Sequence, residues 1–312
     1  LKFNKIKCVI GGNYGFPACT IKDPGKNGII ILELSSYQLD GAKKLSLDLA
    51  TITNITPDHL DYHETFYKYK CSKLKIIKFL KEHGIFVFDS NNKFLNDTIN
   101  QGKYKSVNTI KIKKDKFYDY INDNNYLHGV HNKTNGSIAA SIARHLSIPE
   151  EKIKLSINNF KGLPHRMEPL HISEKIKIIN DSKSTNGEST AAALRSFENI
   201  FWIAGGQPKS GGIGESKKYL DKVIEVFLIG KSTNFFCKEI SKSKKGLPIH
   251  NCLTLEKATK LAFKKGKNSN LKHYVILLSP SAASFDQYKN FVDRGNKFKE
   301  IVNQQMNEGL IV

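Results

Sequence analysis

Two segments rich in acidic and histidine side chains could bind a divalent cation or move a proton. Glu33 ends an apolar run just before the hydroxyl of Ser35, where a carboxylate can hold Mg²⁺ directly or through water. A carboxylate that caps a following helix explains the same position. His59 lies between Asp58 and Asp61 after a Thr-Pro turn, so it could be a metal ligand or a general base. A helix-cap cluster led by Asp58 is the alternative.

Cations and hydroxyls supply further candidates. Lys73 stands in the lysine-rich segment 68–78, and its spacing alone indicates a solvated helix face. The run 180–186 mixes a carboxylate, a cation and hydroxyls, which suits a polar substrate that carries carboxylates and an amine. Residues 184–190 imitate a phosphate loop, but Glu188 stands where a lysine is needed and would repel phosphate.

Two later loops could bind anions. The glycine-rich loop 205–212 permits close backbone approach, and its Lys209 could meet an anion. The sequence contains neither a GxxxxGK[ST] loop nor a well-placed GxGxxG. The segment 279–295 turns at Pro280, and we expect a helix to begin there. Ser284 and nearby N–H groups could then bind a carboxylate at a positive helix end, or form a structural cap.

Short apolar runs precede these candidates and must position them. The runs contain four to seven residues and alternate with helix-length segments, the pattern of buried parallel strands joined by crossover helices. We therefore expect an α/β chain whose chemistry lies beyond the carboxyl ends of its strands. The expected strands are Ile29–Leu34, Thr51–Ile55, Ile85–Phe88, Ile176–Ile179, Ile200–Ala204, Val223–Ile229 and Tyr274–Leu278.

The remaining segments predict the organisation of the chain. Apolar spacing predicts helices over 66–80 and 135–146, and Gly84 is a natural stop for a helix that ends near Glu82. The polar segment 91–125 is expected to form a small antiparallel insertion. Residues 161–164 break the periodicity, so we place a domain boundary near residue 162.

Composition limits the class of protein. A chain of 312 residues holds about two domains, and 39% hydrophobic with 25% charged residues is typical of a folded protein. No apolar run approaches the roughly 20 residues that span a bilayer, so no membrane insertion is expected. The five cysteines form no CxxC pair, which favours the cytoplasm and argues against structural zinc.

The net charge of +20 raises the alternative of a basic nucleic-acid-binding module. Only four of the 49 basic residues are arginine, the side chain best suited to phosphate and guanine contacts. The lysines are spread along the whole chain, as codon preference in an A/T-rich genome would also produce. We therefore expect no nucleic-acid partner; tight, strongly salt-dependent binding to random duplex would contradict this expectation.

Eight segments, taken in order, resemble the Mur ligase family. They are spread over nearly the whole chain, and the last two are typical of the branch that adds D-glutamate. The segments are Gly11–Asn13, Glu33–Leu39, Asn54–Asp61, Ser72–Leu74, His131–Asn135, Gly162–Arg166, Asn180–Asn186 and Ser279–Gly295.

The resemblance implies a three-domain architecture: a domain for a uridine nucleotide, a central P-loop-type ATPase domain and a C-terminal Rossmann-like domain for the amino acid. Residues 1–161 would be the central domain without its phosphate loop, and 162–312 the C-terminal domain. Because Leu1 would follow closely on that loop, we expect a truncated chain that is inactive alone. A monomer is expected, as is frequent in the family.

The implied reaction begins when ATP phosphorylates the carboxylate of UDP-N-acetylmuramoyl-L-alanine. The amine of D-glutamate attacks the acyl phosphate, and a tetrahedral intermediate collapses to the amide with loss of phosphate. Such a reaction needs metal ions and cations more than a protein nucleophile. By resemblance Glu33 would hold one Mg²⁺. His59 and Lys73 would serve a second, Lys73 as its carbamate, because an ammonium would repel the metal.

The resemblance also implies the remaining site residues. The ATP site between the domains would contain Asn132, Asn135, His165, Arg166 and Asp181. D-glutamate would meet Lys183, Thr185, Lys209, Ser284, Phe285 and Phe291, and the muramoyl substrate would meet Asn13, Ser35 and Gln38. Lys209 departs from the family pattern, since Gln and Pro precede it. The alternatives within this class are folylpolyglutamate synthase or another Mur enzyme that adds a different amino acid.

Overall fold

The computed structural model describes residues 1, 4–101, 104–112, 126–127, 129–208 and 211–307. The chain divides into two compact units, a first unit of Leu1–Asn124 with Asn132–Asn159, and a second unit of Asn125–His131 with Phe160–Val312. Both units combine helices with mostly parallel sheets, which confirms the expected α/β class. Of the helices in these described ranges, none has the length and apolar character that a bilayer crossing requires.

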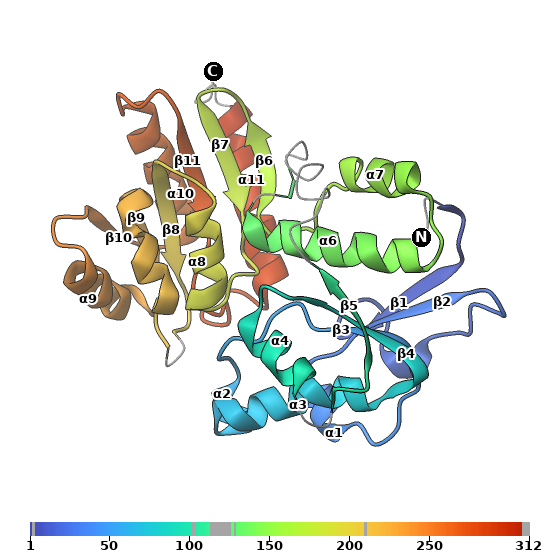
Figure 1. Cartoon of the computed structure of the whole chain (residues 1–312). Coiled ribbons are helices and arrows are strands. Elements are labelled where there is room, and N and C mark those ends of the chain that lie inside the picture. The colour runs from blue at the N-terminus through green and yellow to red at the C-terminus, as the bar shows by residue number, and fades with distance from the viewer. Residues whose placement is uncertain (2–3, 102–103, 113–125, 128, 209–210, 308–312) are drawn as a thin grey trace. The chain divides into compact units, whose positions relative to one another are not determined.

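The first unit contains two parallel sheets (Figure 1). One pairs β1 (Cys8–Gly12) with β2 (Ile29–Glu33), and the other has the order β3 (Leu47–Thr51), β4 (Leu80–Asp89), β5 (Asn108–Ile112). The helices of this unit are α1 (Ser36–Gly41), α2 (Leu60–His63), α3 (Phe66–Lys78), α4 (Lys93–Asn100), α6 (Val130–His145, whose first two residues fall in the second unit) and α7 (Glu150–Asn158).

Strand β4 has apolar side chains on both faces because helices cover both. Phe86 and Phe88 belong to the cluster that includes Leu95 of α4, whereas Val87 packs in a separate cluster with Ile138 of α6. All four aromatic and aliphatic residues named from β4 and α4 are fully buried. Alternate residues of the strand therefore hold opposite layers of the first unit together.

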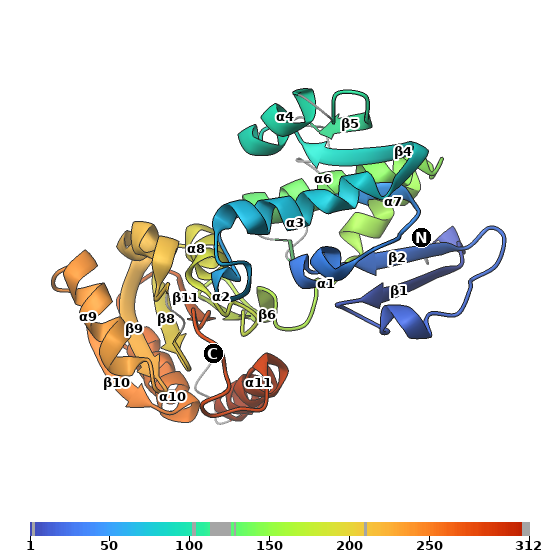
Figure 2. The ribbon, with the colours of Figure 1, turned by 90° about the horizontal axis from the view of Figure 1, so that it is seen from below.

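The second unit is a doubly wound sheet of six strands. The strand order is β10-β9-β8-β11-β7-β6, and only the edge strand β6 is antiparallel. The strands are β6 (Glu168–Ile172), β7 (Ile176–Asn180), β8 (Ile200–Gly205), β9 (Val223–Ile229), β10 (Ile249–Leu253) and β11 (Tyr274–Leu278). The helices are α8 (Gly187–Arg195), α9 (Thr233–Ser243), α10 (Leu255–Lys267), α11 (Phe291–Asn307) and the 3₁₀ helix η4 (Gly214–Lys222). Figure 2 shows these elements from below.

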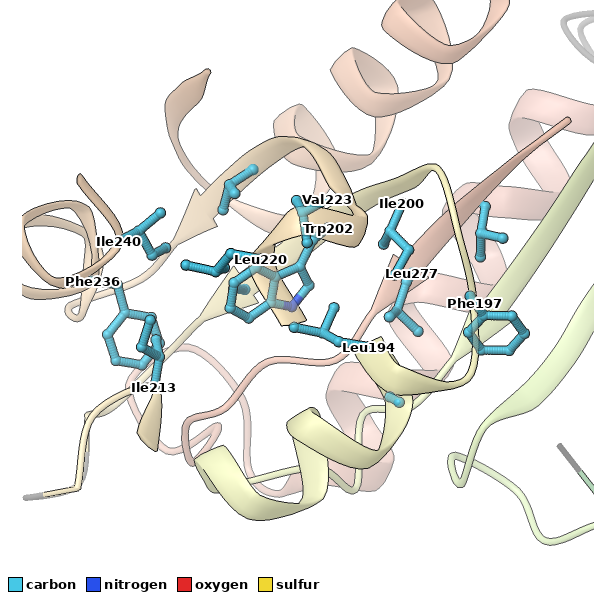
Figure 3. Packing of buried hydrophobic residues seen from close by; sticks show 14 of the residues in the cluster. Leu194, Phe197, Ile200, Trp202, Ile213, Leu220, Val223, Phe236, Ile240 and Leu277 are labelled. Atoms are coloured by element: carbon cyan, nitrogen blue, oxygen red, sulfur yellow. The ribbon is translucent and has the colours of Figure 1, made fainter. Parts of the chain in front are cut away.

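Each face of this sheet has its own core. Trp202 of β8 is fully buried among residues of α8, η4 and α9, such as Leu194, Leu220 and Phe236 (Figure 3). Its neighbour Phe201 points to the opposite face, in the cluster formed with α10 and α11. With both faces covered, the central strands read as uninterrupted apolar runs, as the sequence indicated.

Several local expectations were wrong. The strand expected at Thr51–Ile55 ends at Thr51, where that run begins. Gly84 lies inside β4 rather than after a helix, at a register shift against β3. The segment 91–125 contains α4 and then β5, which pairs with β4 in parallel, so the described part of it is not an antiparallel insertion. Residues 113–125 of that segment lie outside the described residues.

Candidate functional site

At the carboxyl end of β2, four predicted residues lie together in the first unit. Ser35 and Gln38 fix the start of α1 reciprocally: Gln38 N donates to Ser35 Oγ at 3.2 Å, and Ser35 N donates to Gln38 Oε1 at 2.9 Å. Glu33 ends β2, and its Oε1 accepts from Asn13 Nδ2 at 3.4 Å. The carboxylate of Glu33 is exposed and therefore accessible to a ligand.

Lys73 lies on α3 beside the loop that follows β3. Its Nζ donates to Asn54 O at 3.0 Å and lies 5.1 Å from the ring centroid of Tyr69. Burial lowers the pKa of Lys73, and the nearby carboxylate of Asp58 partly opposes this shift. The side chain is half-buried, contrary to the solvated helix face that its spacing indicated. A lowered pKa increases the fraction of neutral amine.

His59 occupies an uncommon backbone conformation at the start of α2. It is the N-cap residue, in the left-handed region with φ 55° and ψ 35°, and Asp58 is therefore not the N-cap that the sequence suggested. Asp58 Oδ1 accepts from His59 N at 2.8 Å. On the ring, Nδ1 lies 2.9 Å from the hydroxyl of Tyr37, and Nε2 lies 3.6 Å from Asp58 Oδ2.

The described residues hold no group of three or more His, Cys, Asp or Glu side chains placed to bind a metal ion. Within them, the hydrogen bonds of the Glu33 side chain lead to Asn13, and not to His59 or Lys73. The Asp58 carboxylate lies close enough to Lys73 to oppose in part the lowering of its pKa by burial, and His59 Nε2 lies 3.6 Å from that carboxylate. Because an ammonium repels a cation, this donor set fits Mg²⁺ when Lys73 carries a carbamate, which adds the oxygen ligands that Mg²⁺ prefers.

Two asparagines predicted for ATP, Asn132 and Asn135, are three residues apart on α6 and so share one side of that helix. Asn135 is exposed, and Asn132 is half-buried.

In the second unit, Asp181 joins three chain segments at the carboxyl end of β7. Its Oδ1 accepts from Met167 N at 3.0 Å, and its Oδ2 accepts from Ser184 Oγ at 2.5 Å and from Ser279 Oγ at 2.8 Å. The residue is 5% exposed. Burial raises the pKa of Asp181 to about 6, although these hydrogen bonds favour the charged form.

We expect Asp181→Asn to change how stability depends on pH. A raised carboxyl pKa means that folding favours the protonated form, so the contribution of Asp181 is fully present below pH 4 and is lost as the pH rises through 6. The stability of the unsubstituted chain relative to Asp181→Asn should therefore fall by roughly 2 kcal/mol between pH 4 and pH 7, since one unit of pKa is about 1.4 kcal/mol. Urea unfolding at several pH values measures this difference, and a constant difference would contradict it.

His165 is buried and held in a left-handed conformation with φ 63°. Its N donates to Glu168 Oε2 at 3.0 Å, and its Nδ1 lies 3.1 Å from Asn180 Nδ2, which donates to it. Burial is the main cause that lowers the pKa of His165, and Lys299 adds to the effect. The imidazole is therefore neutral at pH 7. A Cβ on Gly295 would lie 2.2 Å from its Nδ1, so glycine is required there.

The residues predicted to receive D-glutamate lie partly together. Lys183 Nζ is 3.9 Å from the ring centroid of Phe291, and Lys183 N donates to His165 O at 3.0 Å. The Phe291 and His165 rings meet edge to face, with centroids 6.2 Å apart. Thr185 follows in the same loop and is half-buried. Lys183, Phe291 and His165 thus form one cluster beyond β7, and Arg166 beside them is exposed.

Ser284 and Phe285 differ from the expectation in one respect. The helix begins at Phe291 and not after Pro280, so Ser284 does not lie at a helix N-terminus. It is buried in a turn, where its carbonyl accepts from Gln287 N and Tyr288 N. Phe285 is 69% exposed. Lys209 lies outside the described residues.

Arg294 is the main residue that the sequence analysis did not assign. It is fully buried, and its guanidinium donates to Ser182 Oγ, to the carbonyls of Ser182, Gly205 and Ala282, and to that of Ala283. It therefore connects the loops that follow β7, β8 and β11. The available signal was its position inside a matching segment, in a chain with only four arginines.

Comparison with known proteins identifies the family. Residues 14–159 match the model of the Mur ligase middle domain. The chain is 34% identical to a UDP-N-acetylmuramoylalanine--D-glutamate ligase of Rickettsia felis, over 99% of this chain and 72% of that protein. It is 33% identical to the protein of the same name from Rickettsia bellii, over 97% of this chain and 71% of that one.

Solved structures support the same fold. The MurF ligase of Thermotoga maritima, solved in complex with ADP, matches with a TM-score of 0.63 at 14% identity, over 97% of this chain and 82% of that one. The family match, the identity over most of the relatives' length and the fold agree. This chain therefore belongs to the Mur ligase family, whose members are ATP-dependent, ADP-forming amide ligases of peptidoglycan synthesis.

Proposed function

We propose that this chain serves the ATP-dependent ligation of D-glutamate to UDP-N-acetylmuramoyl-L-alanine. The observation that carries the proposal is the cluster beyond β7, where Lys183 and Phe291 lie together in a chain whose relatives are named as D-glutamate ligases. D-glutamate carries two carboxylates and one amine. A half-buried ammonium ordered against an aromatic ring is suited to one of those carboxylates.

The proposed amino-acid site needs further polar groups for the second carboxylate. Thr185 and Ser284 offer hydroxyl and backbone groups on the loops that follow β7 and β11. Asp181 fixes both loops, because it accepts from Ser184 of one and Ser279 of the other. Phe285, which is exposed, offers an apolar surface and its backbone N–H. Lys209 remains part of the proposal through its position in the glycine-rich loop.

The proposed ATP residues are Asn132, Asn135, His165, Arg166 and Asp181. Arg166 is exposed and always charged, so it can meet a phosphate. His165 is neutral, and Asn180 holds its ring, so its role is to shape the site rather than to supply charge. Asp181 can still accept from a ribose hydroxyl, because a carboxylate has about four acceptor positions and protein donors fill three.

Two cations are proposed. Glu33 would hold one, and His59 with carbamylated Lys73 would hold the other. Bound Mg²⁺ neutralises charge on the phosphoryl group that is transferred. Lys73 forms the carbamate when its neutral amine adds to CO₂ and releases one proton, and its lowered pKa favours that neutral amine. Asn13, Ser35 and Gln38 lie beside Glu33 and are proposed to meet the muramoyl substrate.

In the proposed reaction, a carboxylate oxygen of the muramoyl-alanine substrate attacks the γ-phosphorus of ATP, and ADP leaves. The neutral amine of D-glutamate then attacks the acyl phosphate carbon and loses a proton as phosphate departs. The contribution of this chain is mainly to bring two anionic substrates together and to hold them in place. A cytoplasmic location is proposed because all five cysteines are free thiols.

The test is D-glutamate-dependent release of phosphate from ATP in the presence of UDP-N-acetylmuramoyl-L-alanine, with the amide identified by mass spectrometry. The assay uses the chain extended by an upstream phosphate-loop segment, as the resemblance predicts. L-glutamate and other amino acids serve as controls. Release that depends on another amino acid would indicate a sibling ligase, and no release with any of them would contradict the proposal.

A further inference from the structure

A phenol on α1 contacts the ring of His59. The hydroxyl of Tyr37 and His59 Nδ1 are 2.9 Å apart, and the two rings meet edge to face with centroids 5.0 Å apart. The two residues are 22 positions apart in the sequence, and no motif used in the sequence analysis assigns a role to Tyr37. The contact therefore joins the start of α1 to the start of α2.

Helix α1 is a fixed support for this phenol. Its start is closed by the reciprocal bonds of Ser35 and Gln38. Ser72 Oγ of α3 donates to Ser36 O at 2.6 Å, and Ser36 Oγ lies 2.9 Å from Nε2 of His63. Because Tyr37 directly follows Ser36, its backbone is held on both sides. A group on a rigid element positions its partner more accurately than a group on a loop.

The backbone of His59 is also fixed, so its ring is the variable part. Asp58 holds the N–H of His59, and the His59 carbonyl accepts from Tyr62 N at 3.2 Å and His63 N at 3.0 Å. A residue other than glycine retains a left-handed backbone conformation only where the surrounding contacts hold it there. The ring can still rotate about χ2 and exchange tautomers, and the Tyr37 hydroxyl is the group that contacts Nδ1.

The chemistry of this contact decides which ring nitrogen is available. With Nδ1 engaged, Nε2 is the remaining nitrogen; it lies 3.6 Å from Asp58 Oδ2, beyond hydrogen-bond distance. A phenol can accept from Nδ1–H, which leaves a lone pair on Nε2, or donate to Nδ1, which places the proton on Nε2; only the first arrangement allows Nε2 to bind a cation.

We infer that Tyr37 is a positioning residue for His59, whose hydroxyl holds Nδ1 and so presents Nε2 to the divalent cation. The role of the cation in this inference rests on the proposed function. The contact between Tyr37 and His59 does not depend on it. A partner on the second nitrogen of a metal-binding histidine fixes ring orientation and tautomer, and its loss typically weakens metal affinity 10- to 100-fold. Phenylalanine at position 37 would keep the ring packing and remove only the partner of Nδ1.

The first experiment compares Tyr37→Phe with the matched variant Tyr62→Phe in the 312-residue chain. Tyr62 packs on Tyr37 with centroids 4.6 Å apart, but its hydroxyl donates to Asp40 Oδ2 at 3.3 Å and not to a histidine. Long-range ¹H–¹⁵N spectra of ¹⁵N-histidine report tautomers, and His59→Gln assigns the His59 signals. We expect Tyr37→Phe to shift the His59 ring nitrogens and Tyr62→Phe to leave them in place. Unchanged signals in Tyr37→Phe, or equal changes in both variants, would overturn the inference.

The second experiment measures Mn²⁺ affinity in bicarbonate buffer by titration calorimetry. We expect a 10- to 100-fold larger dissociation constant for Tyr37→Phe than for the unsubstituted chain, and no change for Tyr62→Phe. Equal affinity in all three proteins would overturn the positioning role. If the unsubstituted chain binds no Mn²⁺, the cation site of the proposed function is wrong, and the nitrogen spectra still decide whether Tyr37 sets the His59 ring.

Discussion

Replacing Arg294 with methionine is expected to destabilise the second unit by about 4 kcal/mol or more, because a buried network loses its donor. The guanidinium is fully buried, and burial lowers the pKa of Arg294 to about 10, so it is charged at pH 7. Its Nη2 donates to Ser182 O at 2.9 Å and Ala282 O at 3.0 Å, and its Nε donates to Ser182 Oγ at 3.0 Å. Methionine would leave these acceptors unpaired.

The measurement uses the single tryptophan of the chain. Trp202 lies in the second unit, so its fluorescence during urea unfolding reports on that unit. Arg294→Lys keeps a charge but loses the planar set of donors, and should be intermediate. Arg195→Met is the matched control, since Arg195 is exposed at the end of α8 and its loss should change stability by at most about 0.5 kcal/mol. Equal effects at positions 294 and 195 would refute the role of the network.

Arg294→Met should also weaken the binding of D-glutamate. Calorimetry measures this affinity at a temperature where the variant is folded. Ser182 and Ala283 are chain neighbours of Lys183 and Ser284, two residues proposed to receive that amino acid. Without Arg294 the backbone at Ser182 and Ala283 would be less fixed. The amino-acid site would then be less well ordered before binding, although no direct contact with D-glutamate is lost. If Arg294→Met is folded and binds D-glutamate with unchanged affinity, Arg294 does not order the amino-acid site.

There is a physical reason why the sequence indicated Glu33 and Asp181 as site residues but not Arg294. Glu33 ends strand β2 and Asp181 directly follows strand β7, and ligands bind at the carboxyl ends of parallel strands, so their positions could be predicted. The bonds of Arg294 to Ser182 and Gly205 span 112 and 89 residues. Helical spacing places Arg294 on a helix, but it does not specify which loops that helix meets.

The strands also differ in how well the sequence alone predicts them. Central strands such as β8 and β11 are buried on both faces, so a continuous apolar run identifies them. The edge strands β6 and β10 contain polar residues and, in β6, a proline, so no such run marks them. The start of α11 was misplaced because Pro280 permits a helix, whereas the bonds between Gln207 and Ala283 hold that loop extended.

Truncation of Trp202 is the second change with a large expected effect, since Trp→Ala in a core typically costs about 3–5 kcal/mol. The indole fills the centre of the cluster formed with α8, η4 and α9 (Figure 3). Its Nε1 also donates to Ser279 O at 2.7 Å. Trp202→Phe should cost about 2 kcal/mol, because it loses that bond and part of the packing. Denaturation followed by circular dichroism measures both variants.

The hydrogen bond of Trp202 should affect the site as well as the core. Ser279 Oγ donates to Asp181, and the next residue, Pro280, accepts from Gly205 N at 2.8 Å. Trp202→Phe should therefore reduce hydrogen-exchange protection of the Gly205 amide. Phe236→Leu removes volume from the same cluster without a hydrogen bond and should leave that amide protected. If both variants expose the Gly205 amide equally, cavity formation alone accounts for the effect, and the indole does not position the loop that carries Ser279.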